Sequence, residues 1–137
     1  MKIAVTGKGG VGKTTLASLL AYSYADLGYQ VLAIDADPSP CLGATLGFPP
    51  ESLEKLEPIA KMESLIYERT GAQPGTIGGF FKINPRVDDL PDRFSAVYRG
   101  IRLLTLGAVE MGGAGCICPE SAVLRSLVTH ILLRRDE

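Results

Sequence analysis

Apolar residues along this chain fall into short runs and longer periodic stretches that alternate from the N-terminus onward. Residues 2–6 (KIAVT) and 30–34 (QVLAI) are short apolar runs rich in β-branched residues, so each predicts a buried strand. Between them, residues 13–27 carry apolar residues at helical spacing, and Gly28 follows as a helix-ending glycine. Strand, helix and strand of these lengths predict a βαβ unit with two parallel strands. One face of this helix is expected to carry Leu16, Leu19, Leu20, Ser23 and Leu27.

The middle of the chain is less regular. Residues 38–50 are rich in proline and glycine, which predicts a loop with a short helical turn near 41–46. Residues 51–70 predict one or two short helices. Residues 71–95 hold four glycines and three prolines and are expected to be mostly loop.

Regular patterning returns in the last third. The apolar run at 101–107 predicts a third strand, and residues 119–135 predict a helix that begins at Pro119, a residue favoured in the first turn. Leu124, Leu127, Val128 and Ile131 should share one face of it. The predicted fold class is α/β, with a parallel sheet flanked by helices. Because no strand follows the last crossover, we expect residues 1–137 to be the N-terminal part of a single domain.

Composition narrows the function classes. The chain has 137 residues, 46% of them hydrophobic, and a formal net charge of −1, so neither a nucleic-acid surface nor a charged tail is indicated. No apolar run approaches the roughly 20 residues that cross a bilayer, and the N-terminus lacks a secretory signal pattern. A cytoplasmic location is therefore expected. There, the three cysteines are expected to be free thiols or metal ligands.

A phosphate-binding motif follows the first predicted strand. Residues 7–14, GKGGVGKT, match G-x-x-x-x-G-K-[ST] and open a predicted helix, which is the context this motif requires. Backbone N–H groups and the helix dipole would bind phosphate oxygens, and Lys13 would reach the β- and γ-phosphates. Thr14 would hold Mg²⁺, and Thr15 would donate to the α-phosphate. A glycine-rich turn without a ligand is the alternative. The expected ATP-binding residues are Gly7, Gly9, Gly10, Val11, Gly12, Lys13, Thr14 and Thr15.

A second lysine marks a subclass of this motif. Lys8, followed by two glycines, resembles the deviant phosphate loop of the ParA/MinD/nitrogenase-iron-protein class of P-loop ATPases. That resemblance implies a homodimer in which two protomers face each other across two ATP molecules. It also implies that Lys8 reaches the phosphates bound by the partner and acts in catalysis beside Lys13. A solvated lysine beside a phosphate site is the simpler alternative.

Two aspartates end the second predicted strand, beside the phosphate loop. Alternation along the strand places the side chains of Asp35 and Asp37 on the same side. The resemblance implies that Asp37 orients or deprotonates the attacking water, whereas Asp35 would hold Mg²⁺ or the loop. Both could instead cap backbone amides. Relatives carry a further metal-holding Asp strand that this sequence lacks, so the chain is expected to be a poor ATPase by itself.

A C-x-C pair lies in the glycine-rich segment GGAGCICPE at 112–120. Cys116 and Cys118 point to one side of an extended segment and are too close in sequence to bridge each other easily. Two thiolates are half of a four-ligand site, so a two-fold dimer would complete a centre for Zn²⁺, Ni²⁺ or an iron–sulfur cluster. Small buried residues in a turn are the alternative reading. Cys41 and His130 are expected to have structural roles.

The three motifs GKGGVGKTT, DADP and GGAGCICPE together resemble the nickel-insertion accessory ATPases of carbon monoxide dehydrogenase, the CooC type. The resemblance implies an ATP-hydrolysing metallochaperone that carries Ni²⁺ or Zn²⁺ at the shared C-x-C pair. Its client would be carbon monoxide dehydrogenase or a related nickel enzyme. Two other functions stay open: a ParA/MinD-like dimerising switch, and an ATPase that carries an iron–sulfur cluster.

Overall fold

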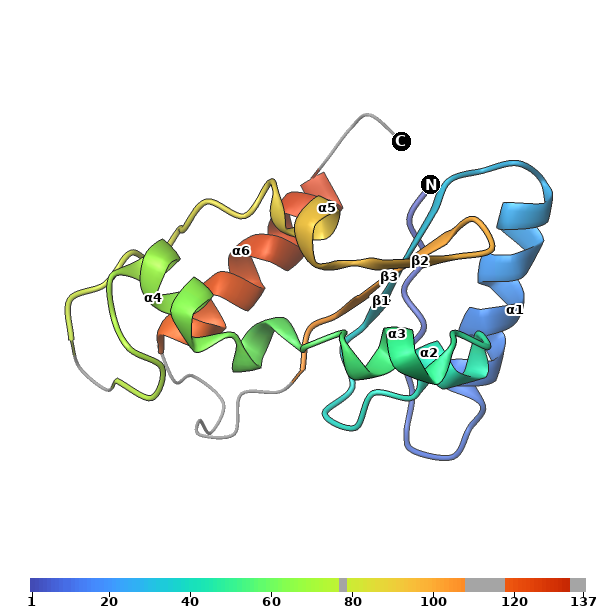
Figure 1. The fold of residues 1–137 in the computed structure, drawn as a ribbon, viewed down its shortest axis with the longest axis horizontal. Coiled ribbons are helices and arrows are strands. Elements are labelled where there is room, and N and C mark those ends of the chain that lie inside the picture. The colour runs from blue at the N-terminus through green and yellow to red at the C-terminus, as the bar shows by residue number, and fades with distance from the viewer. Residues whose placement is uncertain (77–78, 108–117, 134–137) are drawn as a thin grey trace.

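The computed structural model describes residues 1–76, 79–107 and 118–133, and in them a three-stranded sheet lies between helices (Figure 1). This arrangement confirms the expected α/β class. The elements in chain order are α1 (Lys13–Asp26), β1 (Val31–Asp35), α2 (Leu42–Thr45), α3 (Pro50–Glu54), the 3₁₀ turn η1 (Ile59–Lys61), α4 (Glu63–Thr70), α5 (Leu90–Phe94), β2 (Ala96–Tyr98), β3 (Ile101–Thr105) and α6 (Pro119–Leu133).

The sheet has the order β1-β3-β2 and is mixed. Strands β1 and β3 pair in parallel, with Val31 opposite Ile101 and Asp35 opposite Thr105. Strand β2 pairs antiparallel with β3. The two are joined by Arg99 and Gly100, which both have positive φ, at 49° and 78°. Two such residues form the tight hairpin turn whose twist matches that of the strands. The expected parallel pairing is confirmed between β1 and β3, and β2 adds an antiparallel strand that the sequence analysis did not predict.

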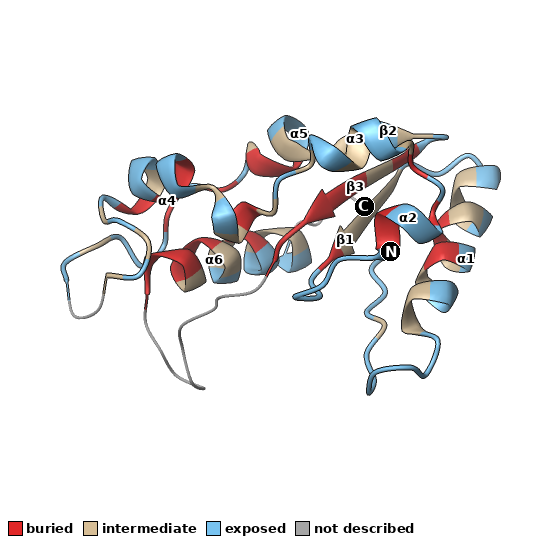
Figure 2. Ribbon diagram, turned by 60° about the horizontal axis from the view of Figure 1, so that its bottom comes forward, coloured by how far each residue is buried: buried red, intermediate tan, exposed pale blue. Residues whose placement is uncertain are grey.

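Both faces of the sheet are covered, because side chains alternate along β1 and β3. Leu32, Ile34 and Leu104 face a core built with α4, η1 and α6, whereas Ala33 and Leu103 face a core built with α1 and α2. Strand β3 is almost wholly buried and forms the centre of the molecule (Figure 2). The carboxyl ends of β1 and β3 thus lie at one edge, where sheets of this kind hold their ligands.

The predicted strand at 2–6 does not form. The segment is mostly exposed, with Ile3 at 52%, and it has no place in the sheet. Among the described residues, β1 pairs along one edge only, with β3. A strand forms only where a neighbouring strand pairs with its backbone N–H and C=O groups, and residues 2–6 pair with none of the described strands. The predicted βαβ unit across 2–34 was therefore wrong, and the parallel partner of β1 is β3.

Helix α1 forms where expected, but it buries a different face. The buried residues are Ser18 and Ala21, whereas Leu16 is 51% exposed and Leu19 is 61% exposed. Small side chains let the helix axis approach the sheet closely, and Ala17, Ala21 and Ala25 pack into that core. Gly28 follows the helix with a φ of 86° and donates its N–H to the Ala25 carbonyl, which confirms it as the helix-ending glycine.

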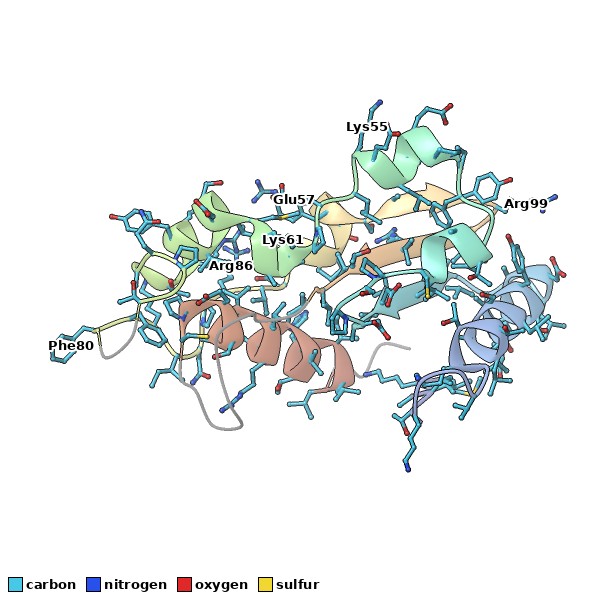
Figure 3. All side chains as sticks on the ribbon, turned by 90° about the horizontal axis from the view of Figure 1, so that it is seen from below. Lys55, Glu57, Lys61, Phe80, Arg86 and Arg99 are labelled. Carbon is cyan, nitrogen blue, oxygen red and sulfur yellow. The ribbon has the colours of Figure 1, made fainter. Side chains whose placement is uncertain are left out.

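The other predicted elements agree with the structure apart from one short helix. The helical turn near 41–46 is α2, residues 51–70 hold helices and a 3₁₀ turn, and the last predicted helix is α6. Helix α5 was missed inside the segment expected to be loop. The rest of that segment is irregular, and Phe80 projects from it into solvent (Figure 3). A helix able to span a membrane is not found in the described part of the chain.

An ion cluster holds α5 against α4. Arg69 donates two hydrogen bonds to Asp89, at 2.8 and 2.7 Å, and Arg93 donates a third at 3.1 Å. The Arg69 side chain is 10% exposed and the Asp89 side chain 28%, so the pair is partly shielded from water. These donors, Arg69 first, hold the pKa of Asp89 well below its ordinary value.

Replacing this carboxylate should destabilise the fold in a pH-dependent way. Asp89→Asn should cost about 2 kcal/mol at pH 7, because charge-assisted hydrogen bonds are lost. The folded-state pKa of Asp89 is depressed, so its contribution is complete above the unfolded pKa near 4 and is lost as pH falls below it. Urea unfolding at pH 7 and pH 3 measures both effects, and the difference between variant and parent should shrink at pH 3.

The control for this prediction is Asp88→Asn. Asp88 pairs with Arg86, whose side chain is 76% exposed, so water already screens the interaction. We expect that variant to unfold like the parent at pH 7. Equal losses in the two variants would show that the partly buried pair of Arg69 and Asp89 has no special part in stability.

Candidate functional site

The phosphate loop leads directly into α1. Gly12 stands at the N-cap with a φ of 87°, and Gly10 has a φ of 78°, a region of backbone conformation that glycine enters without steric cost. The Gly12 carbonyl accepts the N–H of Leu16 at 2.9 Å, which starts the helical ladder. The first N–H groups of a 14-residue helix therefore face the loop, as anion binding requires.

Lys13 lies over this loop. Its Nζ donates to the carbonyl oxygen of Lys8 at 2.9 Å, so the side chain folds back across residues 8–13. The contact is exposed, and a phosphate placed in the loop can compete for the same ammonium donors. Lys8 is itself exposed.

The loop after β1 is organised by Asp35. This side chain is 7% exposed, and its Oδ1 accepts the N–H of Asp37 at 3.1 Å. Its Oδ2 accepts the N–H groups of Cys41 and Leu42, at 3.0 and 2.9 Å. These contacts correspond to the alternative in which Asp35 caps backbone amides, and they anchor residues 35–42 as one unit.

Asp37 has a different environment from Asp35. It is exposed, and its Oδ1 accepts the N–H of Ser39 at 2.9 Å. One carboxylate is thus buried against backbone amides of the loop, while the other is exposed. Because of this difference in burial, Asp35 and Asp37 can have different chemical roles although they are two residues apart in sequence.

Cys41 joins the two loops, which the sequence did not indicate. Its Sγ lies 3.5 Å from the Oγ1 of Thr14, the hydroxyl at the start of α1. Helix α2, which begins at the next residue, packs beside α1 (Figure 2). Residues 27 apart in sequence are therefore brought to one place, and the 7–15 and 35–41 segments form one candidate nucleotide site.

The structure describes one cysteine of the C-x-C pair, Cys118. Cys118 is 2% exposed and precedes α6, where its carbonyl oxygen accepts the N–H of Ala122 at 3.0 Å and the hydroxyl of Ser121 at 2.8 Å. Cys116 lies outside the described residues. The buried thiol is thus held at the first turn of a long helix.

A buried carboxylate follows Cys118 by two residues and was not singled out in the sequence. Glu120 is 9% exposed, and its Oε1 accepts the N–H of Gly75 at 2.8 Å. Its Oε2 is buried and has no hydrogen-bond partner among the described residues. Within residues 1–76, 79–107 and 118–133, no three His, Cys, Asp or Glu side chains gather as a metal-binding group.

Comparison with known proteins supports a nucleotide-binding role for this site. The family model described as the CobQ/CobB/MinD/ParA nucleotide binding domain matches residues 2–114, which include both loops. The carbon monoxide dehydrogenase accessory protein CooC of Rhodospirillum rubrum is 53% identical over 137 residues, covering all of this chain and 52% of that protein. An uncharacterized ATP-binding protein of Methanocaldococcus jannaschii is 49% identical, with the same coverage.

The similarity to the CooC type inferred from the three motifs is thereby confirmed. A shorter match, 50% identical over 44 residues, links 32% of this chain to the arsenical pump-driving ATPase of Escherichia coli, of which it covers 8%. The chain spans about half the length of the first two relatives. With its phosphate loop, its paired aspartates and the match over residues 2–114, the chain belongs to the CobQ/CobB/MinD/ParA nucleotide-binding domain family.

Proposed function

We propose that this chain binds and hydrolyses ATP as part of a dimeric metallochaperone that serves maturation of a nickel enzyme such as carbon monoxide dehydrogenase. The observation that carries the proposal is the meeting of the phosphate loop with the loop after β1, where Cys41 Sγ lies 3.5 Å from Thr14 Oγ1, in a chain that also holds a thiol pair before α6. The 53% identical relative is a carbon monoxide dehydrogenase accessory protein, which supports the accessory role.

Nucleotide binding is assigned to residues 7–15. Glycines of the loop leave room for phosphate oxygens to approach backbone N–H groups at the start of α1. Lys13 would exchange its contact with the Lys8 carbonyl for β- and γ-phosphate oxygens. Mg²⁺ neutralises charge on the phosphates when bound, and the half-buried Thr14 would hold it through Oγ1.

Hydrolysis and dimer formation are assigned to two exposed residues. Asp37 would orient the attacking water, since its carboxylate lies on the outer surface of the loop. Lys8 would contact the phosphates of the partner protomer, because nothing in the described residues buries its side chain. For Asp35 the hydrogen bonds favour anchoring of the loop over direct Mg²⁺ contact.

The transported metal is the cargo, and the proposed carriers are Cys116 and Cys118 of two protomers. Four thiolates suit Zn²⁺ or Ni²⁺, and two-fold symmetry lets each chain supply two. Cys118 is held at the start of α6, so its sulfur would be presented from a rigid element.

Asp37 gives a direct test of the catalytic assignment. Asp37→Asn should slow ATP hydrolysis by about 10²–10⁴-fold, the range for losing a general base, while ATP affinity stays close to that of the parent. Single-turnover hydrolysis and equilibrium ATP titration separate the two effects. Asp26→Asn, an exposed change at the end of α1, is the matched control. An Asp37 variant that hydrolyses ATP at the parental rate would remove Asp37 from the mechanism.

The accessory function itself is tested with a purified nickel-free carbon monoxide dehydrogenase. We expect Ni²⁺-dependent activation to need the parent protein and ATP, and to fail with the Cys116→Ser/Cys118→Ser variant. Equal activation by free Ni²⁺ alone at the same concentration would contradict a delivery role.

A nucleotide-dependent dimerising switch is the second candidate. The burial of Cys118 at 2% favours it, because a small thiol can simply fill a core position. In that case ATP-dependent dimers would form without metal, and replacing both cysteines would leave dimer formation unchanged.

A further inference from the structure

Cys41 has no role in the function proposed above, yet its thiol reaches the nucleotide site. Its Sγ lies 3.5 Å from Thr14 Oγ1, the hydroxyl assigned to the nucleotide-bound cation. The thiol is exposed, so a solute at the phosphate loop can contact it. Both residues lie within the match to the nucleotide-binding domain family, and the phosphate-loop motif supports a nucleotide and its cation at this place.

The position of the sulfur is set by fixed backbone. The N–H of Cys41 donates to the buried Asp35 carboxylate at 3.0 Å, and the N–H of Leu42 donates to the same oxygen at 2.9 Å. The Cys41 carbonyl accepts the N–H and the hydroxyl of Thr45, at 3.1 and 3.0 Å. Cys41 is therefore held from both sides, and its side chain projects from an anchored loop.

The separation of the two side-chain atoms suits a shared cation. Metal–sulfur and metal–oxygen bonds are about 2.3 and about 2.1 Å long, so two such ligands lie roughly 3.1 to 3.6 Å apart at angles between a right angle and a tetrahedral angle. The Thr14–Cys41 separation of 3.5 Å falls within that range. A hydroxyl–thiol pair adds a soft ligand to a position that usually has oxygen ligands only.

We propose that Cys41 determines the cation specificity of the nucleotide site, so that thiophilic divalent cations such as Cd²⁺, Zn²⁺ or Ni²⁺ bind there with ATP in competition with Mg²⁺. The inference rests on the proposed nucleotide binding. When the cation binds sulfur, the thiol releases its proton to water. A site of this composition makes ATP binding respond to soft metal ions, independently of the C-x-C pair.

The test uses the full chain with Cys116→Ser and Cys118→Ser, which leaves Cys41 as the one thiol of three. ATP affinity is measured with Mg²⁺ and with Cd²⁺ as the probe, and thiolate-to-Cd²⁺ charge-transfer absorption is followed in the ultraviolet. The same measurements are made after adding Cys41→Ser or Cys41→Ala. A Cys116→Ala/Cys118→Ala background repeats the test if the serine background folds poorly.

The expected result is an ATP-dependent charge-transfer band in the parent background that disappears in both Cys41 variants. The ratio of ATP affinity in Cd²⁺ to that in Mg²⁺ should fall about tenfold or more, the usual range for removing a group next to a bound metal. Damage to the loop alone would lower both affinities together and leave the ratio unchanged.

Two other outcomes are informative. An unchanged ratio with no band, while Mg²⁺-ATP still binds, would overturn the role of Cys41 and leave the nucleotide site intact. Absence of Mg²⁺-ATP binding in the parent background and in the native chain would instead overturn the proposed function, and the inference with it.

Discussion

Lys13→Ala should abolish most ATP binding by this chain. The ammonium would make charge-assisted hydrogen bonds to phosphate oxygens, and losing two of these costs about 3 kcal/mol. ATP affinity is therefore expected to fall at least about a hundredfold, as measured by isothermal titration calorimetry. The hydrogen bond from Lys13 to the Lys8 carbonyl is exposed, so the fold should survive the loss of this side chain.

The matched control is Lys55→Ala. Lys55 follows α3 and points away from the phosphate loop (Figure 3), so the same change in charge occurs without a phosphate contact. We expect parental ATP affinity in that variant. Equal losses in the two variants would mean that net charge, and not the loop, determines nucleotide affinity, which would contradict the assignment of residues 7–15.

Cys116→Ser/Cys118→Ser should release the bound metal while ATP binding is retained. Removing two thiolates per protomer takes all four proposed sulfur ligands from a dimer, and we expect metal affinity to fall by at least about a thousandfold (~4 kcal/mol). Metal content after anaerobic desalting measures this, with ATP titration on the same sample. The phosphate loop is a separate part of the fold, so ATP affinity should stay within about twofold.

Cys41→Ser is the control for that experiment in the absence of nucleotide. It removes the exposed thiol and leaves the C-x-C pair in place. The metal should stay bound. Loss of metal in Cys41→Ser and its retention in the double variant would move the carrier site away from the C-x-C pair.

Local signals predicted most of the elements. Helix α1, strand β3 and the start of α6 at Pro119 are where the apolar spacing and the capping residues place them. The prediction of a strand at 2–6 was wrong because a strand forms only beside a neighbouring strand, and the local sequence pattern does not show whether such a neighbour is present. The hairpin at Arg99 and Gly100 did carry a signal, a glycine just before an apolar run, and it was missed.

The site was predicted in its motifs and not in its contacts. The phosphate-loop pattern names its residues because each has a fixed chemical task. Asp35 and Asp37 look equivalent in sequence, and only the fold shows that one carboxylate is buried against backbone amides while the other is exposed. The approach of Cys41 to Thr14 depends on that anchoring and on the packing of α2 beside α1, so spacing along the chain carried no sign of it.

The face of α1 that is buried also depends on the fold and not on the local sequence pattern. Leucines at helical spacing predicted the packed face of α1. In the structure the alanine face is packed instead, because small residues permit close contact with β1 and β3. Hydrophobicity alone favours burial of the larger side chains. The short distance between the helix and the sheet instead favours burial of the small ones.

The central claim, a metal shared between two chains under control of ATP, is tested most directly by anaerobic titration with Ni²⁺ and with Zn²⁺, with and without ATP, while the mass in solution is recorded. The account predicts one metal ion per two chains, bound by the dimer and lost in the Cys116→Ser/Cys118→Ser variant. One metal ion per monomer, or ATP-dependent dimers without metal that are unchanged in the variant, would contradict it.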